Sequence, residues 1–550
     1  MASKHDATIS RRAFVRNTVG AGATAVAGIA AADAAAQVPL RWDRSADVVV
    51  IGAGATGIPA AIEARENGAS VIVIEQNTDI GGHAIQSGAS MPLGGGTSLQ
   101  KKYGIEDSAD RYFEELVNNP DFRFNDRELI RVFCDWSAPT FEWLVAHGVV
   151  FPDRAPTGNG PTRRAQNPVW AGGVSNVSPT GADGTALMRP LEAAARKLGV
   201  EILLEHSFTS LVRDERSGDV VGIRATSKGR SLAVQARKGV ILGTGGHTSN
   251  VDFRRMFDPR ATEEYQVVGE PYSRQSADGE RAALQIGASL WGVANQTLER
   301  GIALLKPGVI GTRYGYPSPR GGRAIPDLPK SPLFSRMRAI GLEVKDFQDV
   351  IHVNRTGRRF VNEAAARYDW INPCLGWNGA AGNGGGPIWA IFDADAAARE
   401  GWVCAPPHVD PDGWFFTGST LAELAGRIAN PYQKEPMPGA ALQATVERYN
   451  SFVDAGADAD FGKPAPKYKV RTPPFYAAWS TPCAHDSLTG LRINAQSQAV
   501  GLDGRVISGL YCGGESAGGF SLHGLARCII QGRIAGRDAA RRSPGSDART

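Results

Sequence analysis

The sequence predicts an α/β fold built on a mostly parallel β-sheet, and two observations predict it. Residues 47–51 form a short, continuous apolar run, which is typical of a buried parallel strand, and a glycine-rich turn follows at once at 52–57. A helix-period stretch then leads to a second apolar strand at 70–74, which ends in Glu75. Strand, turn, helix and strand in this order form a βαβ unit of the Rossmann type.

The glycine turn and the acidic residue indicate a bound dinucleotide. Gly52, Gly54 and Gly57, around Thr56, let backbone amides approach a pyrophosphate at the N-terminus of a helix. Glu75 lies where a carboxylate can accept hydrogen bonds from both ribose hydroxyls. The alternative is a glycine-rich turn that binds nothing, but the two strands and the acidic residue favour a nucleotide site.

The elements that follow continue the mixed pattern. Five more helix-period stretches are expected, at 107–118, 126–147 (with Pro139 inside it), 184–198, 420–428 and 440–454. Three strand segments are typical of an antiparallel meander that returns to the nucleotide-binding sheet, at 200–212, 220–227 and 231–246. Two glycine-rich segments are expected to be irregular, at 301–332 and 376–386.

The first 36 residues have the three parts of a secretory segment. Arg11 and Arg12 give the basic start, 19–29 the weakly apolar middle and 34–36 the small-residue exit. The Ser-Arg-Arg-x-Phe sequence resembles the twin-arginine export signal. We therefore expect residues 1–36 to be a signal peptide and the mature protein to be periplasmic; a disordered tail with a chance arginine pair is the alternative.

Composition and charge argue against several classes of protein. The net charge of +4 and the lack of a long basic run argue against a nucleic-acid partner. No later stretch approaches the roughly eighteen apolar residues of a membrane helix, so no span is expected in the mature chain. The six cysteines form no C-x-x-C or C-x-x-C-H, which argues against an iron–sulfur cluster or covalent haem, and no metal site is expected. Any electron exchange then needs an external carrier, such as a cytochrome, a quinone or oxygen.

Five motifs occur in an order that points to one family. They are EQNTDIGGH (75–83), GVILGTGG (239–246), ADGERAALQIGA (277–288), VNRTGRRFVNE (353–363) and GLYCGGESAGG (509–519). Together they resemble the flavoprotein superfamily of FAD-dependent fumarate reductases, succinate dehydrogenases and 3-ketosteroid dehydrogenases. The resemblance implies an FAD-binding domain, with a central parallel sheet and a β-meander, and an inserted α+β capping domain. The implied limits are 46–295 and 484–542 for the first domain and 296–483 for the second.

The resemblance also implies which residues contact FAD. The matching positions are Gly52, Gly54, Thr56, Gly57, Glu75, Gly82, His83, Gly88, Ala89, Asp278, Gly514 and Glu515. Asp278 and Glu515 would accept hydrogen bonds from hydroxyls of the cofactor, although a helix N-cap and a solvated turn are the alternatives for them. His83 lies near a position where some members bond the flavin covalently, but a non-covalent FAD is expected here.

The chemistry that the resemblance implies is hydride transfer between flavin N5 and a carbon next to a carbonyl or carboxylate. Arg367 matches the arginine that transfers the proton, and His485 and Arg527 match the residues that bind the substrate. Guanidinium groups suit this role because they stay charged and donate in a fork. The alternatives are a surface ion pair for Arg367, a core histidine for His485 and a structural contact for Arg527.

Two departures from fumarate reductase put recognition of a dicarboxylate in doubt. The stretch 292–301, where that family has a second carboxylate-binding histidine, contains Gln296 and Thr297 but no histidine, and 301–338 looks like an insertion. His523 is expected either to point into the site or to have a cap or core role. Two tyrosines are the substitutes for Arg367 if the proton takes another route, Tyr368 and Tyr476.

The sequence therefore predicts an FAD-dependent oxidoreductase that interconverts C–C and C=C bonds beside a carbonyl or carboxylate of a small substrate. The direction of the reaction stays open. A non-catalytic flavoprotein, serving as an electron carrier or ligand-binding protein on the same scaffold, is the alternative, because fold alone does not exclude it. A third alternative is a protein that binds NAD and no flavin.

Overall fold

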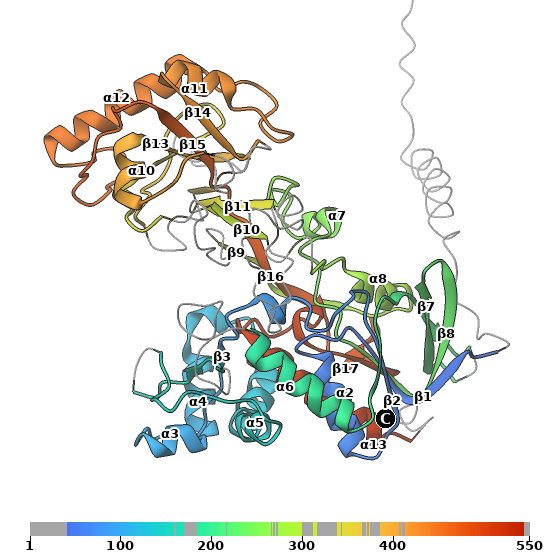
Figure 1. Cartoon of the computed structure of the whole chain (residues 1–550). Helices are drawn as coiled ribbons and strands as arrows, with labels where there is room; N and C mark the ends of the chain where they lie inside the picture. Colours follow the sequence, from blue (N-terminus) through green and yellow to red (C-terminus); the bar gives the residue numbers. More distant parts are fainter. Residues whose placement is uncertain are drawn as a thin grey trace, which may run out of the picture.

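The computed structural model shows two bodies joined by a long two-stranded ribbon (Figure 1). The larger, lower body contains both ends of the described chain and the smaller, upper body lies between them in sequence. The structure describes residues 41–158, 161–169, 184–215, 217–265, 267, 270, 273–299, 312–315, 338–342, 344–365, 370, 373–374, 386–405, 409 and 413–543. The expected signal peptide, Arg367 and Tyr368 lie outside these residues.

The lower body is built on the predicted α/β sheet, so the expected fold class is confirmed. Its strands run in the order β17 (Gln498–Val500), β18 (Val506–Cys512), β8 (Arg230–Leu242), β1 (Arg44–Ile51), β2 (Val71–Ile74) and β5 (Glu201–Leu203). All neighbours from β18 to β5 are parallel, and β17 is an antiparallel edge. The four residues of β2 are all buried, as a strand covered on both faces requires.

Two helices that pack closely on each other support the end of the sheet where the glycine turn lies. They are α2 (Gly57–Glu66) and α13 (Leu525–Arg541), and they meet through glycines. A Cβ atom on Gly532 would lie 2.2 Å from the carbonyl oxygen of Thr56, and one on Gly536 would lie 2.2 Å from that of Ala60. The contact therefore joins the glycine turn to the last helix of the chain.

The meander forms as predicted from β6 (Ser207–Arg213), β7 (Val220–Ser227) and β8, which are antiparallel. The first expected strand, 200–212, is divided, because β5 pairs with β2 before the chain turns into β6. Glu205 takes a positive φ of 57° at this turn. The segment therefore contributes to both the parallel sheet and the meander.

Three helices of the lower body lie close to their predicted limits: α4 (Ala109–Asn118), α5 (Arg127–Ala146) and α6 (Gly184–Lys197). Three shorter helices were not predicted: α3 (Ser98–Lys102), α7 (Val251–Arg255) and α8 (Asp278–Gln285). Asp126 caps α5, since its Oδ1 accepts hydrogen bonds from the amides of Glu128 and Leu129. Pro139 lies inside α5 without ending it. A short pair of strands, β3 (Met91–Pro92) and β4 (Ala165–Gln166), completes this body.

The upper body is a four-stranded antiparallel sheet with helices on it. The strand order is β12 (Ile351–Asn354), β13 (Ile388–Phe392), β15 (Phe475–Trp479) and β14 (Phe415–Gly418). The helices are α10 (Ala394–Glu400), α11 (Leu421–Arg427) and α12 (Gly439–Ala455), so both helices predicted here are present. Trp389 and Trp479 pack edge to face in its core, with ring centroids 5.4 Å apart.

The ribbon between the bodies consists of β9 (Leu290–Glu299) and β16 (Cys483–Leu491), which are antiparallel. The expected domain limits at 296 and 484 fall within these two strands, and they stay a prediction. The expectation of an irregular segment at 301–332 is wrong in one place, because β10 (Thr312–Gly315) pairs with β11 (Arg338–Leu342). The rest of that segment lies outside the described residues, as do 376–385.

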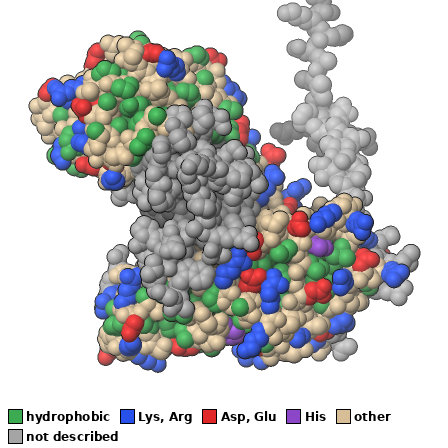
Figure 2. Space-filling model, in the orientation of Figure 1, with side chains coloured by type: hydrophobic (Ala, Val, Ile, Leu, Met, Phe, Trp, Pro, Cys, Tyr) green, Lys and Arg blue, Asp and Glu red, His purple; other side chains and the backbone are tan. Residues whose placement is uncertain are grey.

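The surface of the protein carries charges of both signs. Figure 2 shows basic and acidic side chains interspersed over both bodies on the face drawn, in keeping with the small net charge. Among the residues that the structure describes, none of the helices combines the length and the apolar character that a membrane span needs.

Candidate active site

A cavity of about 470 Å³ lies in the lower body, outside the carboxyl ends of β1, β2 and β8. This edge of a parallel sheet is where α/β proteins bind their ligands. The wall brings together most of the residues that the sequence singled out: Gly52, Gly54, Thr56, Glu75, Gly82, His83, Gly88, Ala89, Asp278, His485, Glu515, His523 and Arg527. Segments far apart in the sequence therefore form one site.

The three glycines of the turn have different roles. A Cβ atom on Gly57 would lie 1.8 Å from the carbonyl oxygen of Gly52, and one on Gly52 would lie 2.3 Å from that of Gly243. These two positions exclude any side chain because backbone packs on backbone. A Cβ atom on Gly54 would meet only the carbonyl oxygen of Gly81, at 3.8 Å, and Gly54 lines the cavity. Gly54 therefore keeps the cavity open.

Glu75 fixes the glycine turn from the end of β2. Its Oε2 accepts a hydrogen bond from the amide of Ala53 at 2.8 Å, and its Oε1 accepts one from the amide of Asn77 at 2.9 Å. Burial raises the pKa of the Glu75 carboxyl, and the backbone donors partly oppose this. The residue that was expected to contact the ribose thus also holds the loop beside it.

The next wall segment follows β2 and has an unusual backbone. Gly81 and Gly82 have φ angles of 103° and 48°, and Ala89 has a φ of 52°, which is uncommon for a residue with a side chain. Gly82, Gly88 and Ala89 all line the cavity. A cofactor that passes close to this backbone would explain why the chain keeps these conformations.

Asp278 begins helix α8 at the cavity wall. The N-cap position belongs to Ala277, which has a φ of 62°, so the alternative role of Asp278 as the N-cap is wrong. Asp278 Oδ2 accepts a hydrogen bond from Ser276 Oγ at 2.6 Å. The carboxylate therefore faces a polar rim of the cavity.

Glu515 lies in the cavity wall rather than in a solvated turn. Its Oε2 accepts hydrogen bonds from Gln275 Nε2 at 2.7 Å and from the amide of Ser487 at 3.1 Å. Burial, reinforced by the charge of Asp486, raises the pKa of Glu515 to about 8. Its neighbour Gly514 does not line the cavity but packs on the glycine turn, since a Cβ atom there would lie 2.3 Å from Thr56 Oγ1.

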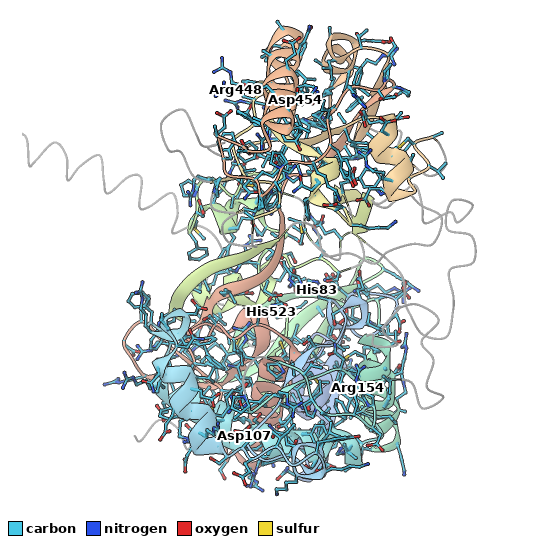
Figure 3. The ribbon with its side chains drawn as sticks, turned by 90° about the vertical axis from the view of Figure 1, so that its left-hand side faces the viewer. His83, Asp107, Arg154, Arg448, Asp454 and His523 are labelled. Atoms are coloured by element: carbon cyan, nitrogen blue, oxygen red, sulfur yellow. The ribbon has the colours of Figure 1, made fainter. Side chains whose placement is uncertain are left out.

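His83 lies at the end of the lower body that faces the upper one, near His523 (Figure 3). Its Nδ1 is buried and has no hydrogen-bond partner among the described residues. Burial lowers the pKa of His83 to about 4, so the ring is neutral at neutral pH. Its ring centroid lies 5.4 Å from that of His485. A neutral imidazole with a buried, unpartnered nitrogen fits a hydrogen bond to a ligand.

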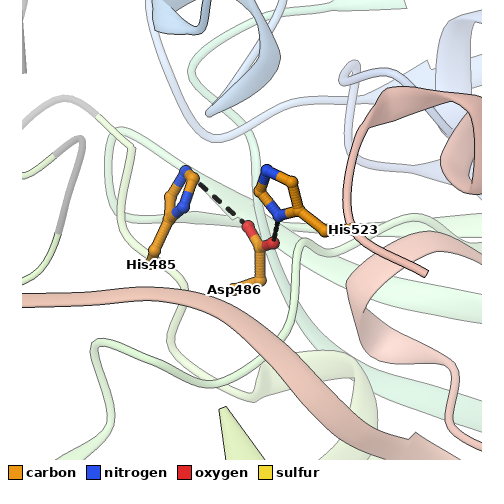
Figure 4. A group of neighbouring side chains, drawn as sticks. All are labelled: His485, Asp486 and His523. Atoms are coloured by element: carbon orange, nitrogen blue, oxygen red, sulfur yellow. Dashed lines mark hydrogen bonds and ion pairs between the residues drawn. The ribbon is translucent and has the colours of Figure 1, made fainter. Parts of the chain in front are cut away.

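Three side chains meet at this end of the cavity (Figure 4). His523 Nδ1 is hydrogen-bonded to Asp486 Oδ2, and His485 Nε2 lies 3.8 Å from Asp486 Oδ1. His485 and Asp486 are consecutive in β16, where side chains should alternate between faces. The register against β9 slips between Ala484 and Ser487, so an extra residue is accommodated there and both side chains line the cavity.

Sequence reasoning missed Asp486. The only signal was its place directly after His485, and strand alternation argues against two adjacent residues sharing a face. The ligand atoms of His485, Asp486 and His523 lie within 4.8 Å of one another, close enough for a divalent cation. The Asp486–His523 hydrogen bond already uses one atom of each, however, so the arrangement is that of a hydrogen-bonded carboxylate–imidazole pair.

Arg527 lies in the first turn of α13 and is buried against the cavity. Its Nη1 donates to the carbonyl oxygen of Phe520, while its buried Nε has no hydrogen-bond partner among the described residues. A buried guanidinium that is not neutralised by a carboxylate attracts an anionic ligand strongly. Tyr476, in contrast, stacks on Phe392 in the core of the upper body, and this placement does not support a role in proton transfer.

Comparisons with known proteins agree with this geometry. The pattern of the FAD binding domain family matches residues 47–310 and 324–528. The chain belongs to this family. The match favours FAD over a nicotinamide, and the glycine turn, the positive-φ wall and the unpartnered His83 nitrogen fit that cofactor.

Individual relatives are enzymes that act on double bonds. The chain is 29% identical to a urocanate reductase of Eggerthella lenta over 520 residues, covering 92% of this chain and 76% of that one. It is 27% identical to a fumarate reductase (cytochrome) of Shewanella frigidimarina over 509 residues, covering 90% and 77%. The open conformation of a flavocytochrome c3 fumarate reductase matches in fold, with a TM-score of 0.64 and 23% identity over 98% of this chain and 83% of that one.

These findings establish the class of activity. This flavoprotein is an FAD-dependent oxidoreductase that interconverts C–C and C=C bonds next to a carbonyl or carboxylate. The alternative of a non-catalytic carrier or ligand-binding protein is not favoured, because the relatives are enzymes. The resemblance to the fumarate reductase and ketosteroid dehydrogenase superfamily is likewise supported.

Proposed function

We propose that this flavoprotein works as a reductase, and that its substrate carries a carbon–carbon double bond conjugated to a carboxylate or carbonyl group. The observation that carries the proposal is Arg527, a buried cation in the wall of the cavity that His485 and His523 also line. The reductive direction is supported by the urocanate and fumarate reductases among the relatives.

The glycine turn and Glu75 hold the adenosine and pyrophosphate part of FAD in this proposal, since Gly54 leaves the necessary space. Asp278 and Glu515 accept hydrogen bonds from hydroxyls of the cofactor, and Gly82, Gly88 and Ala89 let the backbone approach it. His83 makes a hydrogen bond rather than a covalent bond. When bound, FAD supplies a hydride at flavin N5.

Arg527 and His485 bind and polarise the substrate. The carboxylate or carbonyl oxygen accepts hydrogen bonds from the guanidinium of Arg527, and this contact strengthens as negative charge develops on the oxygen. The imidazole of His485 lines the same cavity as Arg527, whose Nε has no hydrogen-bond partner among the described residues. Arg367 delivers the proton to the neighbouring carbon, a role that rests on the sequence motif alone.

The electron donor is external, and the enzyme works outside the cytoplasm. The proposal of export rests on the paired arginines and the small-residue segment at 34–36. A cytochrome or a reduced quinone then donates electrons to the protein, whereas oxygen could act only as an acceptor in the reverse direction.

The chemistry is tested by photoreducing the purified yellow protein without oxygen and adding unsaturated acids and enones. Urocanate, fumarate, acrylate and an unsaturated ketone form a sufficient first panel, and the saturated partners with an artificial acceptor test the reverse direction. We expect at least one unsaturated compound to reoxidise the flavin at a rate that a stopped-flow experiment can follow. Reoxidation by none of them, together with fast exchange with a cytochrome, would show a carrier instead.

The role of Arg367 is tested by Arg367→Gln. Turnover should fall by about a hundredfold or more with an unchanged flavin spectrum, because only the proton step is affected. If this variant keeps normal turnover while Tyr368→Phe loses it, the proton is transferred by the tyrosine. The mechanism is then of the kind used by ketone dehydrogenases rather than by fumarate reductases.

Export is tested with Arg11→Lys combined with Arg12→Lys. The double variant should remain inside the cell, and N-terminal sequencing of exported parent protein should begin at Gln37. Normal export of the double variant through the general secretory route would refute the twin-arginine assignment.

A further inference from the structure

The carboxylate of Asp486 is enclosed by groups from four parts of the chain. His485 precedes it on β16, His523 lies in the turn before α13, His83 follows β2, and Glu515 follows β18. The side chain of Asp486 is 11% exposed. A carboxylate at this position has no part in the roles assigned to the residues that bind the cofactor and the substrate.

Asp486 turns one nitrogen of each neighbouring imidazole toward itself. His523 Nδ1 is hydrogen-bonded to Oδ2, and His485 Nε2 lies 3.8 Å from Oδ1. Burial opposes the charge on Asp486, but the two histidines hold the pKa of its carboxyl far below the usual range. Asp486 therefore stays ionised, and its charge offsets the positive charge that either imidazole gains.

Arg527 is in a different position. Its Nη1 donates to a neutral backbone carbonyl, that of Phe520, so no carboxylate offsets its charge through that bond. Glu515, the other carboxyl nearby, has a pKa raised to about 8 and is mostly protonated at neutral pH. One anionic group of a ligand is therefore attracted to Arg527, whereas a second would lie beside the charge of Asp486.

We propose that Asp486 is a specificity-determining residue that restricts the cavity to substrates with a single anionic group. The carboxylate or carbonyl binds at Arg527, and the other end of the substrate, uncharged or a hydrogen-bond donor, lies against Asp486. This inference rests on the proposed function, because it takes Arg527 as the anchor. It names the substrate class as unsaturated monoacids and enones, and it excludes dicarboxylates.

The test is an equilibrium measurement on the FAD-loaded protein with two saturated acids, propionate and succinate. Binding is followed by the change in the flavin absorption spectrum, which needs no turnover. In the parent, we expect the Kd of succinate to exceed that of propionate by about tenfold or more at pH 7. In Asp486→Asn, which keeps an oxygen that accepts from His523, the ratio should fall to about one.

A ligand with one carboxylate replaced by an amide separates a charge effect from a change of shape. Succinamate is similar in shape to succinate but carries a single negative charge, so Asp486 should not exclude it at pH 7. The Kd of succinate relative to that of succinamate should therefore fall in Asp486→Asn. A change of shape alone would leave this ratio unchanged.

Two further variants complete the design. Asp458→Asn removes a buried carboxylate of the upper body, outside the cavity wall, and should keep the parental ratio. His523→Gln removes an imidazole that offsets the charge of Asp486, so the Kd of succinate relative to that of propionate should rise. If Asp486→Asn does not fold, His523→Gln tests the inference in its place. Equal binding of both acids by the parent, or an unchanged ratio in Asp486→Asn, overturns this inference alone. If neither acid binds the parent, the anchor at Arg527 and the proposed function fail as well.

Discussion

The upper body and the cavity of the lower body both bury charged side chains, but they treat them differently. In the upper body Arg359 donates to Glu363 and to Asp458, each at 2.9 Å, and Lys463 Nζ lies 3.4 Å from Glu363. Burial alone would raise the pKa of Glu363, yet Lys463 and Arg359 lower it to about 2. This cluster is an ion-pair network that holds its own fold together.

In the cavity, polar groups are buried without such partners. His83 Nδ1 and Arg527 Nε have no hydrogen-bond partner among the described residues, and the pKa of Glu515 is raised to about 8 rather than lowered. A protein keeps such groups at a cost in stability, which a bound ligand offsets. The difference between Glu363 and Glu515 teaches that a structural network supplies its own charge partners, whereas this part of the cavity wall leaves polar atoms available to a ligand.

The largest expected effect comes from filling the cavity at the glycine turn. Gly54→Val should give a folded protein without FAD, because the added side chain meets little protein but occupies the space of the pyrophosphate. Gly57→Val is the contrasting variant, since its Cβ atom would lie 1.8 Å from the carbonyl oxygen of Gly52. It should fail to fold. Absorbance at 450 nm and circular dichroism separate the two results, and a yellow Gly54→Val would refute the nucleotide site.

The next prediction compares a glutamate-to-glutamine substitution in the upper body with one in the cavity wall. Glu363→Gln should lower the free energy of unfolding by about 3–5 kcal/mol at pH 7, because it leaves Lys463 and Arg359 without a charge partner. Glu515→Gln should instead raise it at pH 7, because the native carboxyl must take up a proton on folding at that pH and a glutamine need not. Chemical denaturation in excess FAD measures both. Equal losses for the two variants would contradict the distinction between network and ligand site.

The pH dependence of these variants has opposite signs. The folded pKa of Glu363, about 2, lies below its unfolded value near 4.3, so its stabilisation is present above about pH 4.3 and is lost as the pH falls toward 2. The folded pKa of Glu515 lies above its unfolded value, so stability falls as the pH rises from about 4.3 to 8. Glu515→Gln should remove that fall, and Glu363→Gln should remove the acid-dependent loss. Unfolding curves at about pH 2.5, 4, 6 and 8 give both slopes.

The smallest expected effect concerns His83. We expect FAD to leave the polypeptide in a denaturing gel, so that no band fluoresces under ultraviolet light. A fluorescent band in the parent that disappears in His83→Ala would show a covalent bond at this residue and contradict the assignment of a hydrogen bond.

The sequence was sufficient for the parts of the molecule that local patterns specify. The βαβ unit, the meander, the longer helices and the five motifs each follow from residues close together in the chain, whereas the short helices α3, α7, α8 and α10 were not predicted. Asp486 could not be predicted, because its place in the cavity depends on a register slip between β9 and β16, whose partners are almost 190 residues apart. The pairing of Arg359 with Asp458 depends equally on tertiary packing, although both residues were visible in the sequence.

The central claim is that the buried cation at the substrate end of the cavity makes this flavoprotein an enzyme for conjugated double bonds. The most direct measurement is the rate at which an unsaturated acid reoxidises the photoreduced protein, in the parent and in Arg527→Ala. Arg541→Ala is the control, since Arg541 lies at the exposed end of the same helix, where it bonds Asn67. The account predicts weaker binding and a rate lower by about a hundredfold or more in Arg527→Ala, with the parental rate in Arg541→Ala. A parental rate and affinity in Arg527→Ala would contradict it.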